Sequence, residues 1–236
     1  MNELLQKLTT EKSAYERSKA AEALGRLGPV AVTAVSALAT AANTDADGLA
    51  RSAAVWALGR IGVANRDVIT IVAKGLTDRD DLVRMRAAMA LEDFGPAAKD
   101  AVPALIAALN DDDRLCRHSK ADALAAIGPA AKAAVPALLA MLRKGDEDDR
   151  RWALNALGGI GPAAKEAVPT LVAGLLLAQS SEDYPYSQAL RRIGTGAGEA
   201  VQPLVARLGD PDARVRMRAA DGLAELAKAP GAIEAL

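Results

Sequence analysis

The feature that most constrains this chain is a block of sequence that recurs at a fixed interval. The block over 94–109 begins Phe-Gly-Pro-Ala-Ala-Lys, and close copies of it begin at Ile127 and Ile160. Successive copies of its glycine are separated by 34 residues once and by 33 residues four times; these marker glycines are Gly28, Gly62, Gly95, Gly128, Gly161 and Gly194. A repeat of this length is typical of a stacked array, in which each unit packs only on its neighbours.

Each repeat contains two stretches with helical periodicity. In the clearest copy, an inner helix over 80–94 carries Val83, Ala87 and Leu91 on one face and ends at a marker glycine, which favours a helix stop. An outer helix is expected over 97–109, with Pro103 either in its first turn or at a kink. The other outer helices are expected over 2–8, 30–43, 66–76, 130–143, 163–178 and 197–208, the other inner helices over 13–27, 48–61, 113–127, 147–160, 186–193 and 213–227, and 230–236 closes the chain. We therefore predict one all-α solenoid domain over residues 1–236 with about seven helix pairs.

Composition narrows the classes of partner. The chain is 51% hydrophobic but only 3% aromatic, so Ala, Leu, Val and Ile must fill the core of closely spaced helices. Its net charge of −1 gives no reason to expect nucleic-acid or membrane-surface binding. The longest apolar runs, such as 170–178, are too short to span a bilayer. One cysteine excludes an internal disulfide and suits a reducing compartment. We expect a soluble, cytoplasmic protein.

Charged residues recur in register with the marker glycines. An arginine lies eleven residues before most markers, and an aspartate lies six residues before several of these arginines. Such residues can bond to one another and to neighbouring repeats through charge-assisted hydrogen bonds. We expect a structural ladder rather than a phosphate-binding stripe; its members are Asp45, Arg51, Asp78, Arg84, Asp111, Arg117, Asp210 and Arg216.

The ladder and the Gly-Pro-Ala-Ala-Lys-x-Ala-Val-Pro-Ala-Leu block resemble HEAT repeats, in particular the short bacterial type first named after phycobilin lyases. The resemblance runs from about Leu4 to Ala227. It implies a right-handed α-solenoid that is used mostly for binding. The chain departs from the pattern at three ladder positions, where it has Glu11, Lys144 and Asp183.

Candidate sites for chemistry are few. Cys116 falls at an inward apolar position, which predicts a buried, inert thiol. His118 is the only histidine, and one histidine cannot build the metal site of HEAT-like hydroxylases. The glycine-rich stretch 194–198 lacks the Lys-Ser/Thr ending of a phosphate loop and is interpreted as an ordinary turn. We therefore expect no enzyme activity, no metal and no cofactor.

The remaining signal lies on the inner helices, whose exposed face lines the concave surface in the family that the chain resembles. Two columns, ten and six residues before each marker, are expected to point there. They hold side-chain types that anchor protein interfaces. With Trp152 beside them, the candidate partner-binding residues are Trp56, Met85, Met89, His118, Asp122, Arg151, Trp152, Asn155, Tyr184 and Gln188. The alternative is that both tryptophans pack between repeats and the methionines fill gaps.

The sixth repeat departs most from the pattern. The stretch 179–186 places Pro185 between two tyrosines where an inner helix should start, so that helix is expected to be short. The stretch is either an eroded repeat that tolerates a loop or a tyrosine-bearing loop at the rim of the binding face.

Four hypotheses about function follow. The leading one is a non-catalytic scaffold or adaptor that binds a partner protein, or is a subunit of a larger assembly. The resemblance alone suggests a tetrapyrrole-handling protein of the phycobilin-lyase type. A DNA-repair solenoid could use Trp56, Asp122 and Trp152, although the near-neutral charge argues against strong phosphate contact. An engineered array is the fourth, and the irregular sixth repeat argues for an inherited sequence.

Overall fold

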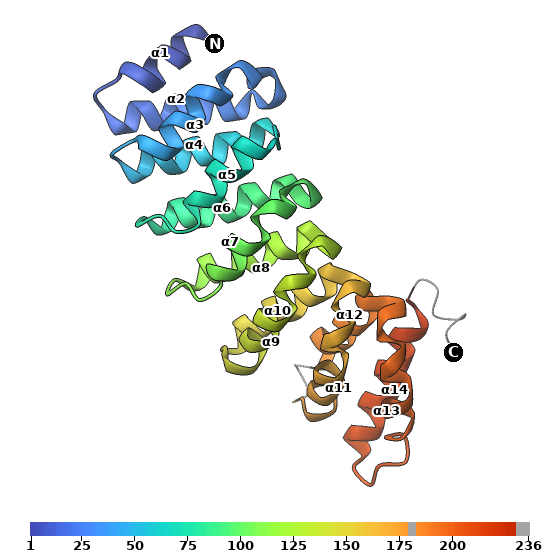
Figure 1. Cartoon of the computed structure of the whole chain (residues 1–236). Helices are drawn as coiled ribbons and strands as arrows, with labels where there is room; N and C mark the ends of the chain where they lie inside the picture. Colours follow the sequence, from blue (N-terminus) through green and yellow to red (C-terminus); the bar gives the residue numbers. More distant parts are fainter. Residues whose placement is uncertain (179–182, 230–236) are drawn as a thin grey trace. The chain divides into compact units, whose positions relative to one another are not determined.

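A computed structural model describes residues 1–178 and 183–229 of the chain, and every regular element in those residues is helical. Figure 1 shows the helices stacked in pairs along the sequence. Contacts between residues group the chain into two compact units, 1–127 and 128–236, which are described one at a time. The single domain expected over 1–236 stays a prediction.

The first unit contains four helix pairs. In each pair the first helix is the outer one and the second is the inner one. Short 3-10 helices precede two of the outer helices. In chain order the elements are α1 (Asn2–Thr10), α2 (Ala14–Arg26), η1 (Gly28–Ala34), α3 (Val35–Thr44), α4 (Gly48–Ile61), α5 (Arg66–Gly75), α6 (Asp81–Phe94), η2 (Gly95–Ala101), α7 (Val102–Ala107) and α8 (Arg114–Ile127).

The second unit contains three pairs among its described residues, and each outer helix follows a 3-10 helix. Its elements are η3 (Gly128–Ala134), α9 (Val135–Lys144), α10 (Glu147–Ile160), η4 (Gly161–Ala167), α11 (Val168–Leu177), α12 (Asp183–Ile193), η5 (Gly194–Ala200), α13 (Val201–Val205) and α14 (Ala213–Ala227). The predicted closing segment 230–236 lies outside the described residues.

Local sequence explains where the inner helices begin and end. Asp47 and Asp80 precede α4 and α6, and their carboxylates accept the backbone N–H two residues further on, which caps each helix start. All six marker glycines have positive φ, between 54° and 78°. Residues with a Cβ are strained in this conformation, so glycine is required at these six inner-helix ends. The predicted helix stops are confirmed.

The outer helices begin later than predicted in several repeats. The helix expected over 97–109 is a 3-10 helix followed by α7, and those expected over 130–143 and 163–178 start at Val135 and Val168. The cause is the proline in the first turn of each α-helix, such as Pro103, which has no N–H to bond to a preceding carbonyl. Of the two alternatives for Pro103, the start of a helix is the observed one.

The sixth inner helix also differs from the prediction. It was expected over 186–193, but α12 spans Asp183–Ile193, so Tyr184 and Tyr186 are helical and do not lie in a loop. Pro185 falls in the first turn of α12, where no intrahelical partner for an N–H is needed. The residues 179–182 of the predicted loop lie outside the described part of the chain.

Small side chains let the inner helices approach closely. In the first unit α2, α4, α6 and α8 pack in series, and in the second unit α10, α12 and α14 do so. Ala87, Ala88 and Ala121 are fully buried at these contacts. A Cβ added to Gly59 would lie 2.9 Å from the Cβ of Ala90 on the next inner helix. Alanine and glycine therefore set the spacing between repeats.

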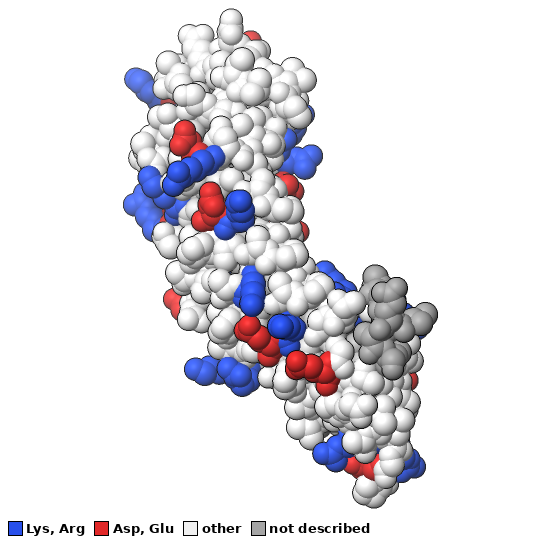
Figure 2. Space-filling view, turned by 45° about the vertical axis from the view of Figure 1, so that its right-hand side comes forward, with Lys and Arg blue, Asp and Glu red and all other residues white. Residues whose placement is uncertain are grey.

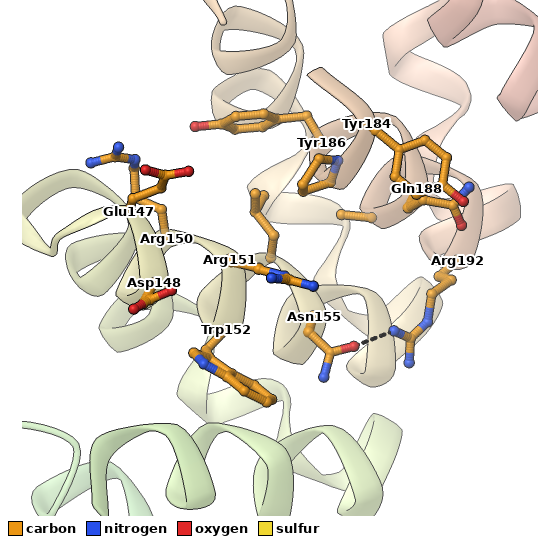
Figure 3. Close-up of a pocket in the computed structure, with 13 residues that line it drawn as sticks. Glu147, Asp148, Arg150, Arg151, Trp152, Asn155, Tyr184, Tyr186, Gln188 and Arg192 are labelled. Atoms are coloured by element: carbon orange, nitrogen blue, oxygen red, sulfur yellow. Dashed lines mark hydrogen bonds between the residues drawn. The ribbon is translucent and has the colours of Figure 1, made fainter. Parts of the chain in front are cut away.

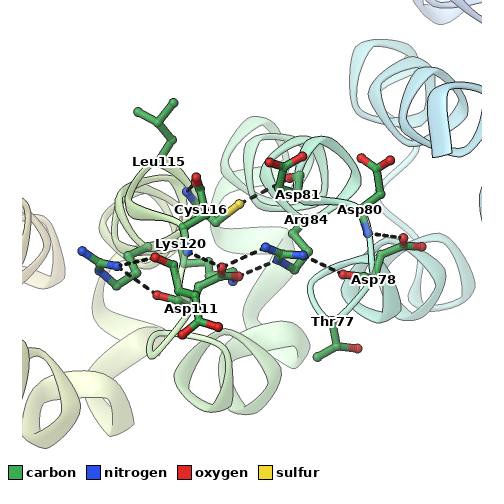
Figure 4. Close-up of polar contacts among 12 residues, drawn as sticks. Thr77, Asp78, Asp80, Asp81, Arg84, Asp111, Leu115, Cys116 and Lys120 are labelled. Atoms are coloured by element: carbon green, nitrogen blue, oxygen red, sulfur yellow. Dashed lines mark hydrogen bonds and ion pairs between the residues drawn. The ribbon is translucent and has the colours of Figure 1, made fainter.

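The ladder arginines join successive repeats in the first unit, as Figure 4 shows for Arg84 and Asp111. The Nε and Nη2 atoms of Arg51 donate to the carboxylate of Asp78 in the next repeat, at 2.8 and 2.7 Å, and Arg17–Asp45 and Arg84–Asp111 repeat this fork. The third arm of each arginine donates to a carbonyl of its own turn: Nη1 of Arg51 bonds to the carbonyl oxygen of Asp45 at 3.0 Å. Each arginine therefore stabilises the turn of its own repeat and bonds to the next repeat.

Arg117 and Arg216 also bond to carbonyls of their own turns. Nη1 of Arg117 donates to the carbonyl oxygen of Asp111, and Nη1 of Arg216 donates to that of Asp210, at 3.0 and 2.8 Å. The carboxylate of Asp210 accepts from Arg207. The Asp45–Arg51 and Asp78–Arg84 contacts are likewise made through the aspartate carbonyl, while the aspartate carboxylates face the preceding repeat.

A buried lysine extends the ladder at Asp111. Lys120 is fully buried, and its ammonium group bonds to Asp111 Oδ2. Five other inner helices carry an alanine at this position, for example Ala54 and Ala87, and α12 carries Tyr186, so a lysine in a mostly alanine column was the available sequence signal. Burial would raise the pKa of Asp111, but hydrogen bonds from Arg84, Lys120 and a backbone N–H outweigh it and lower that pKa to about 2.

Two helical stretches, Arg114–Lys144 and Glu147–Leu177, are long and apolar enough to cross a membrane by length and composition alone. Each one turns at a marker glycine, since Gly128 has φ +72° and Gly161 has φ +67°. Each stretch therefore consists of an inner and an outer helix joined by a 3-10 helix. Their apolar residues fill the repeat core, and we interpret them as core helices.

The marker glycine can be tested with a matched pair in η5. Gly194 has φ +61° and Gly198 does not have a positive φ, yet an added Cβ would meet nothing within 4 Å at either position. We expect Gly194→Ala to lower the free energy of unfolding by about 1 kcal/mol because of backbone strain alone. Gly198→Ala should change it by less than about 0.5 kcal/mol. Urea unfolding followed by circular dichroism measures both, and equal effects would contradict the assignment of strain.

Asp111 predicts a pH-dependent contribution to stability. Because its folded pKa is depressed to about 2, its contribution is fully present above its unfolded pKa near 4 and is lost as the pH falls toward 2. We expect Asp111→Asn to lower the free energy of unfolding by roughly 2 kcal/mol at pH 7, with the difference from wild type shrinking between about pH 4 and 2. The exposed neighbour Asp112 supplies the control Asp112→Asn, which should have little effect at either pH. A difference that does not depend on pH would contradict this assignment.

Candidate functional site

The described residues of each unit form a groove along the inner helices. The larger one, the α10–α12 groove, has a volume of about 680 Å³. The smaller one, the α4–α6 groove, has a volume of about 300 Å³. The α10–α12 groove is lined by Glu147, Asp148, Arg150, Arg151, Trp152, Leu154, Asn155, Tyr184, Pro185, Tyr186, Gln188, Ala189 and Arg192.

The α10–α12 groove gathers five of the predicted residues. Arg151, Trp152 and Asn155 reach it from α10, and Tyr184 and Gln188 reach it from α12 (Figure 3). They come together because positions three and four apart share a helix face, and because α10 and α12 are packed side by side. The binding role of these residues stays a prediction, but the structure places them in one groove.

Arg192 contacts α10 at two points in this groove. Its Nη1 atom donates to Asn155 Oδ1 at 2.6 Å, from α12 to α10. Its aliphatic stem crosses Gly158, where an added Cβ would lie 3.2 Å from Arg192 Cδ. The glycine therefore makes room for the arginine stem, and the amide orients its guanidinium group.

Two tyrosines border the groove in different ways. The side chain of Tyr184 is exposed, with 67% of the residue's surface accessible. Tyr186 is half-buried, and its ring lies on Gly174 of α11, where an added Cβ would come within 2.2 Å of Tyr186 Cε1. Tyr184 is thus available for contacts, whereas Tyr186 packs within its own repeat.

The side chain of Gln188 bonds to Arg191 of its own helix and to Glu225 of the next repeat. Its Oε1 atom accepts from Arg191 Nη2 at 2.6 Å, and its Nε2 atom donates to Glu225 of α14 at 3.3 Å. Glu225 also forms ion pairs with Arg191 and Lys228. This network orients the Gln188 amide along one wall of the α10–α12 groove.

The α4–α6 groove is built around Trp56, and its lining residues are Trp56, Arg60, Met89, Ala90 and Asp93. The indole ring lies against Gly25 of α2 on one side, where an added Cβ would be 2.6 Å from the ring. Arg86 of α6 stacks over the ring at 5.6 Å from its centroid. Trp56 therefore packs between repeats, as the alternative interpretation holds, and it also lines a groove, while its binding role stays a prediction. Met89 is 40% exposed beside it.

The expected exposure of the column ten residues before each marker is wrong for three members. Ser18, Ser52 and His118 are buried, and 6% of His118 is accessible. This column borders the buried stripe of each inner helix, so packing decides its exposure. Ser18 and Ser52 suit burial because their hydroxyls donate to carbonyls three residues earlier, at 2.8 and 2.9 Å.

Two further candidates, Met85 and Asp122, are half-buried and do not line either groove. In contrast, six charged residues of the grooves were missed: Glu147, Asp148 and Arg150 near the start of α10, and a set of three formed by Arg60, Asp93 and Arg192. The members of this set lie two residues before a marker glycine, one helical turn beyond the column that contains Trp56 and Met89. That third column was the signal that could have found this set.

Charges of both signs are interspersed over the face shown in Figure 2. In the described part of the chain, no three His, Cys, Asp or Glu side chains are grouped as metal ligands would be.

The predicted burial of Cys116 is confirmed. Burial raises the pKa of its thiol to about 11, and Sγ bonds to the carbonyl oxygen of Asp81 at 3.3 Å.

Comparison with protein-family models gives three matches. A model described as HEAT repeats matches residues 1–92 and 69–158, and a model of the single HEAT repeat matches residues 200–229. A model described as the PBS lyase HEAT-like repeat matches residues 149–176. A search of the curated proteins found no match.

Solved structures with similar folds include natural and engineered proteins. A structure of importin beta aligns with the whole chain at a TM-score of 0.70 and 17% identity, and the chain spans 36% of that protein. A chain from a structure of Kap95p binding to RanGDP aligns with 99% of the chain at a TM-score of 0.68 and 13% identity, with 36% of that chain covered. An engineered protein aligns with 96% at a TM-score of 0.52 and 25% identity, with 97% of that protein covered.

The contact between Gly174 and Tyr186 can be tested by a double-mutant cycle. We expect Gly174→Ala to lower the free energy of unfolding by about 1–3 kcal/mol, because the new methyl group overlaps the tyrosine ring. In a Tyr186→Ala background the same change should be close to neutral. Chemical unfolding of the four proteins measures the coupling, and purely additive effects would contradict this packing.

Proposed function

Since this chain belongs to the HEAT repeat family, we propose that it is a non-catalytic protein-interaction module. The partner protein binds along the solvent-facing side of the inner helices, in the region of the grooves. The cytoplasmic location expected from the sequence is part of the same proposal.

The α10–α12 groove is the observation that carries this proposal. It places the exposed side chains of Arg151 and Tyr184 next to the half-buried side chains of Trp152, Asn155 and Gln188. Tyrosine, tryptophan and arginine are the residue types that contribute most to protein interfaces. The surrounding hydrogen bonds of Asn155 and Gln188 limit the entropy that binding would cost.

Family and fold support the proposal in general terms. Repeat solenoids present extended surfaces and are used mostly for binding. One similar structure is described as showing Kap95p bound to RanGDP, which is a protein–protein complex. The partner of the present chain is not inferred from it, because a likeness at 13% identity concerns the fold alone.

Tetrapyrrole handling is a second candidate, favoured by the match of residues 149–176 to the PBS lyase HEAT-like repeat. That segment includes α10 from residue 149 onward, which forms one wall of the larger groove. Incubation of the protein with bilin would change the visible absorbance of the pigment if this function holds. DNA repair has less support, because charges of both signs alternate over the face seen in Figure 2 and the net charge is −1.

Partner capture from an extract of the source cells tests the leading proposal. We expect the double variant Arg151→Ala/Tyr184→Ala to retain at most about a tenth of a partner that the wild type captures, because two anchors are lost. The control is Arg143→Ala/Leu177→Ala, which removes the same kind of exposed bulk from α9 and α11. The proposal fails if the groove variant, folded by circular dichroism, captures every partner as well as the control does.

A further inference from the structure

We propose that the α10–α12 groove binds an acidic segment of a partner protein, with one Asp or Glu carboxylate held between Arg151 and Arg192. This inference rests on the proposed interaction function and adds the chemical class of the partner. It is carried by the charges of the groove, by the way in which one arginine is oriented, and by the size of the groove.

The two arginines bring positive charge into the groove without acidic partners. In the described structure Arg151 makes no hydrogen bond or ion pair, and the one bond of Arg192 is to the neutral amide of Asn155. Figure 3 shows their guanidinium groups directed toward the same part of the groove, with Asn155 between them. Two like charges that converge on one concave site favour an anion.

None of the nearby acidic side chains forms an ion pair with Arg151 or Arg192 in the described structure. Glu147 lies one turn before Arg151 on α10, but no ion pair joins them, and the two side chains lie apart in Figure 3. Asp148 belongs to the same first turn of α10. Glu225 of α14 already accepts bonds from Arg191, Gln188 and Lys228. The positive end of the groove therefore has room for an external carboxylate.

The geometry of the donors suits a carboxylate in particular. A guanidinium group presents a planar fork of N–H donors that matches the two oxygens of a carboxylate. The stem of Arg192 is fixed by Gly158, and its Nη1 atom is fixed by Asn155, so little of its conformational entropy remains to be lost on binding. The ladder of the first unit uses the same fork-to-carboxylate contact between its repeats.

The size and polarity of the groove favour a protein segment over nucleic acid. A volume of about 680 Å³ exceeds the space that a single ion needs and accommodates several residues. Figure 3 shows Glu147 and Asp148 away from Asn155 and Arg192, with Arg150 beside Glu147. Regularly spaced phosphates would meet these carboxylates, whereas a protein segment can combine an acid at the arginine end with a neutral or basic residue at the other end. The exposed ring of Tyr184 adds an apolar contact along the wall.

Selection from a displayed library of random short peptides tests the inference. We expect the wild-type protein to enrich peptides rich in Asp and Glu. The variant Arg151→Glu/Arg192→Glu should lose this enrichment and select Lys and Arg instead. A matched control, Arg143→Glu/Lys165→Glu, makes the same change in net charge on α9 and η4 and should select as the wild type does.

A synthetic copy of one selected acidic peptide then gives the affinity by calorimetry. Replacing its Asp or Glu by Asn or Gln should weaken binding to the wild type roughly tenfold, and the Arg151→Glu/Arg192→Glu variant should show at least that loss. Arg151→Lys/Arg192→Lys, which keeps the charge but not the fork, should bind with intermediate affinity.

Three results would overturn the inference: no acidic enrichment by the wild type, equal affinity for the acidic peptide and its amide analogue, or charge-sensitive binding of a random single-stranded DNA pool in place of peptides.

The same variants distinguish this inference from the proposed function. If Arg151→Glu/Arg192→Glu captures the cellular partner as well as the wild type does, the acidic-segment inference fails and the interaction function stands. If the wild type captures no partner, the interaction function itself fails.

Discussion

The arginine fork between successive repeats is the interaction on which the first unit of this structure depends. Each of three arginines donates two hydrogen bonds to an aspartate of the next repeat and at least one to a carbonyl of its own turn. A repeat in a solenoid contacts only its neighbours, so register must be set at every junction. Charge-assisted bonds with fixed geometry set it at the turns, while the alanine contacts between inner helices set the spacing.

The α10–α12 groove lies where the ladder pattern is broken. At the position where the acidic partner of Arg150 would stand, the chain has Leu177, and Asp183 replaces the next arginine. Here Arg150 lines the groove, and Nη1 of its guanidinium group donates to the carbonyl oxygen of Gly145. A departure from a repeat pattern is therefore informative in a solenoid, because the regular positions are already explained by packing. The same argument identifies Lys120, which stands in a column where five of the other six inner helices have alanine, and which adds a second cation to Asp111.

Glycine acts in this chain in two ways that depend on geometry. The marker glycines have a backbone conformation that other residues adopt only with strain, so they end the inner helices. Gly25, Gly158 and Gly174 are instead required by what lies on them: the ring of Trp56, the stem of Arg192 and the ring of Tyr186. The first kind recurs with the repeat. The second kind is specific to one junction, and each member supports a side chain that borders a groove or packs beside it.

The sequence by itself determined the all-helical repeat, the inner-helix ends and the membership of Trp56, Met89, Arg151 and Tyr184 in columns of one helix face. These follow from period, from glycine and proline stereochemistry and from helical spacing, all of which are local. Only the tertiary structure decided that the ladder bonds run from one repeat to the next, that His118 is buried, and that Arg192 joins Asn155 across a groove. Those facts depend on how adjacent helices pack, and residues such as Arg51 and Asp78, 27 apart in sequence, or Asn155 and Arg192, 37 apart, meet only when that packing is in place.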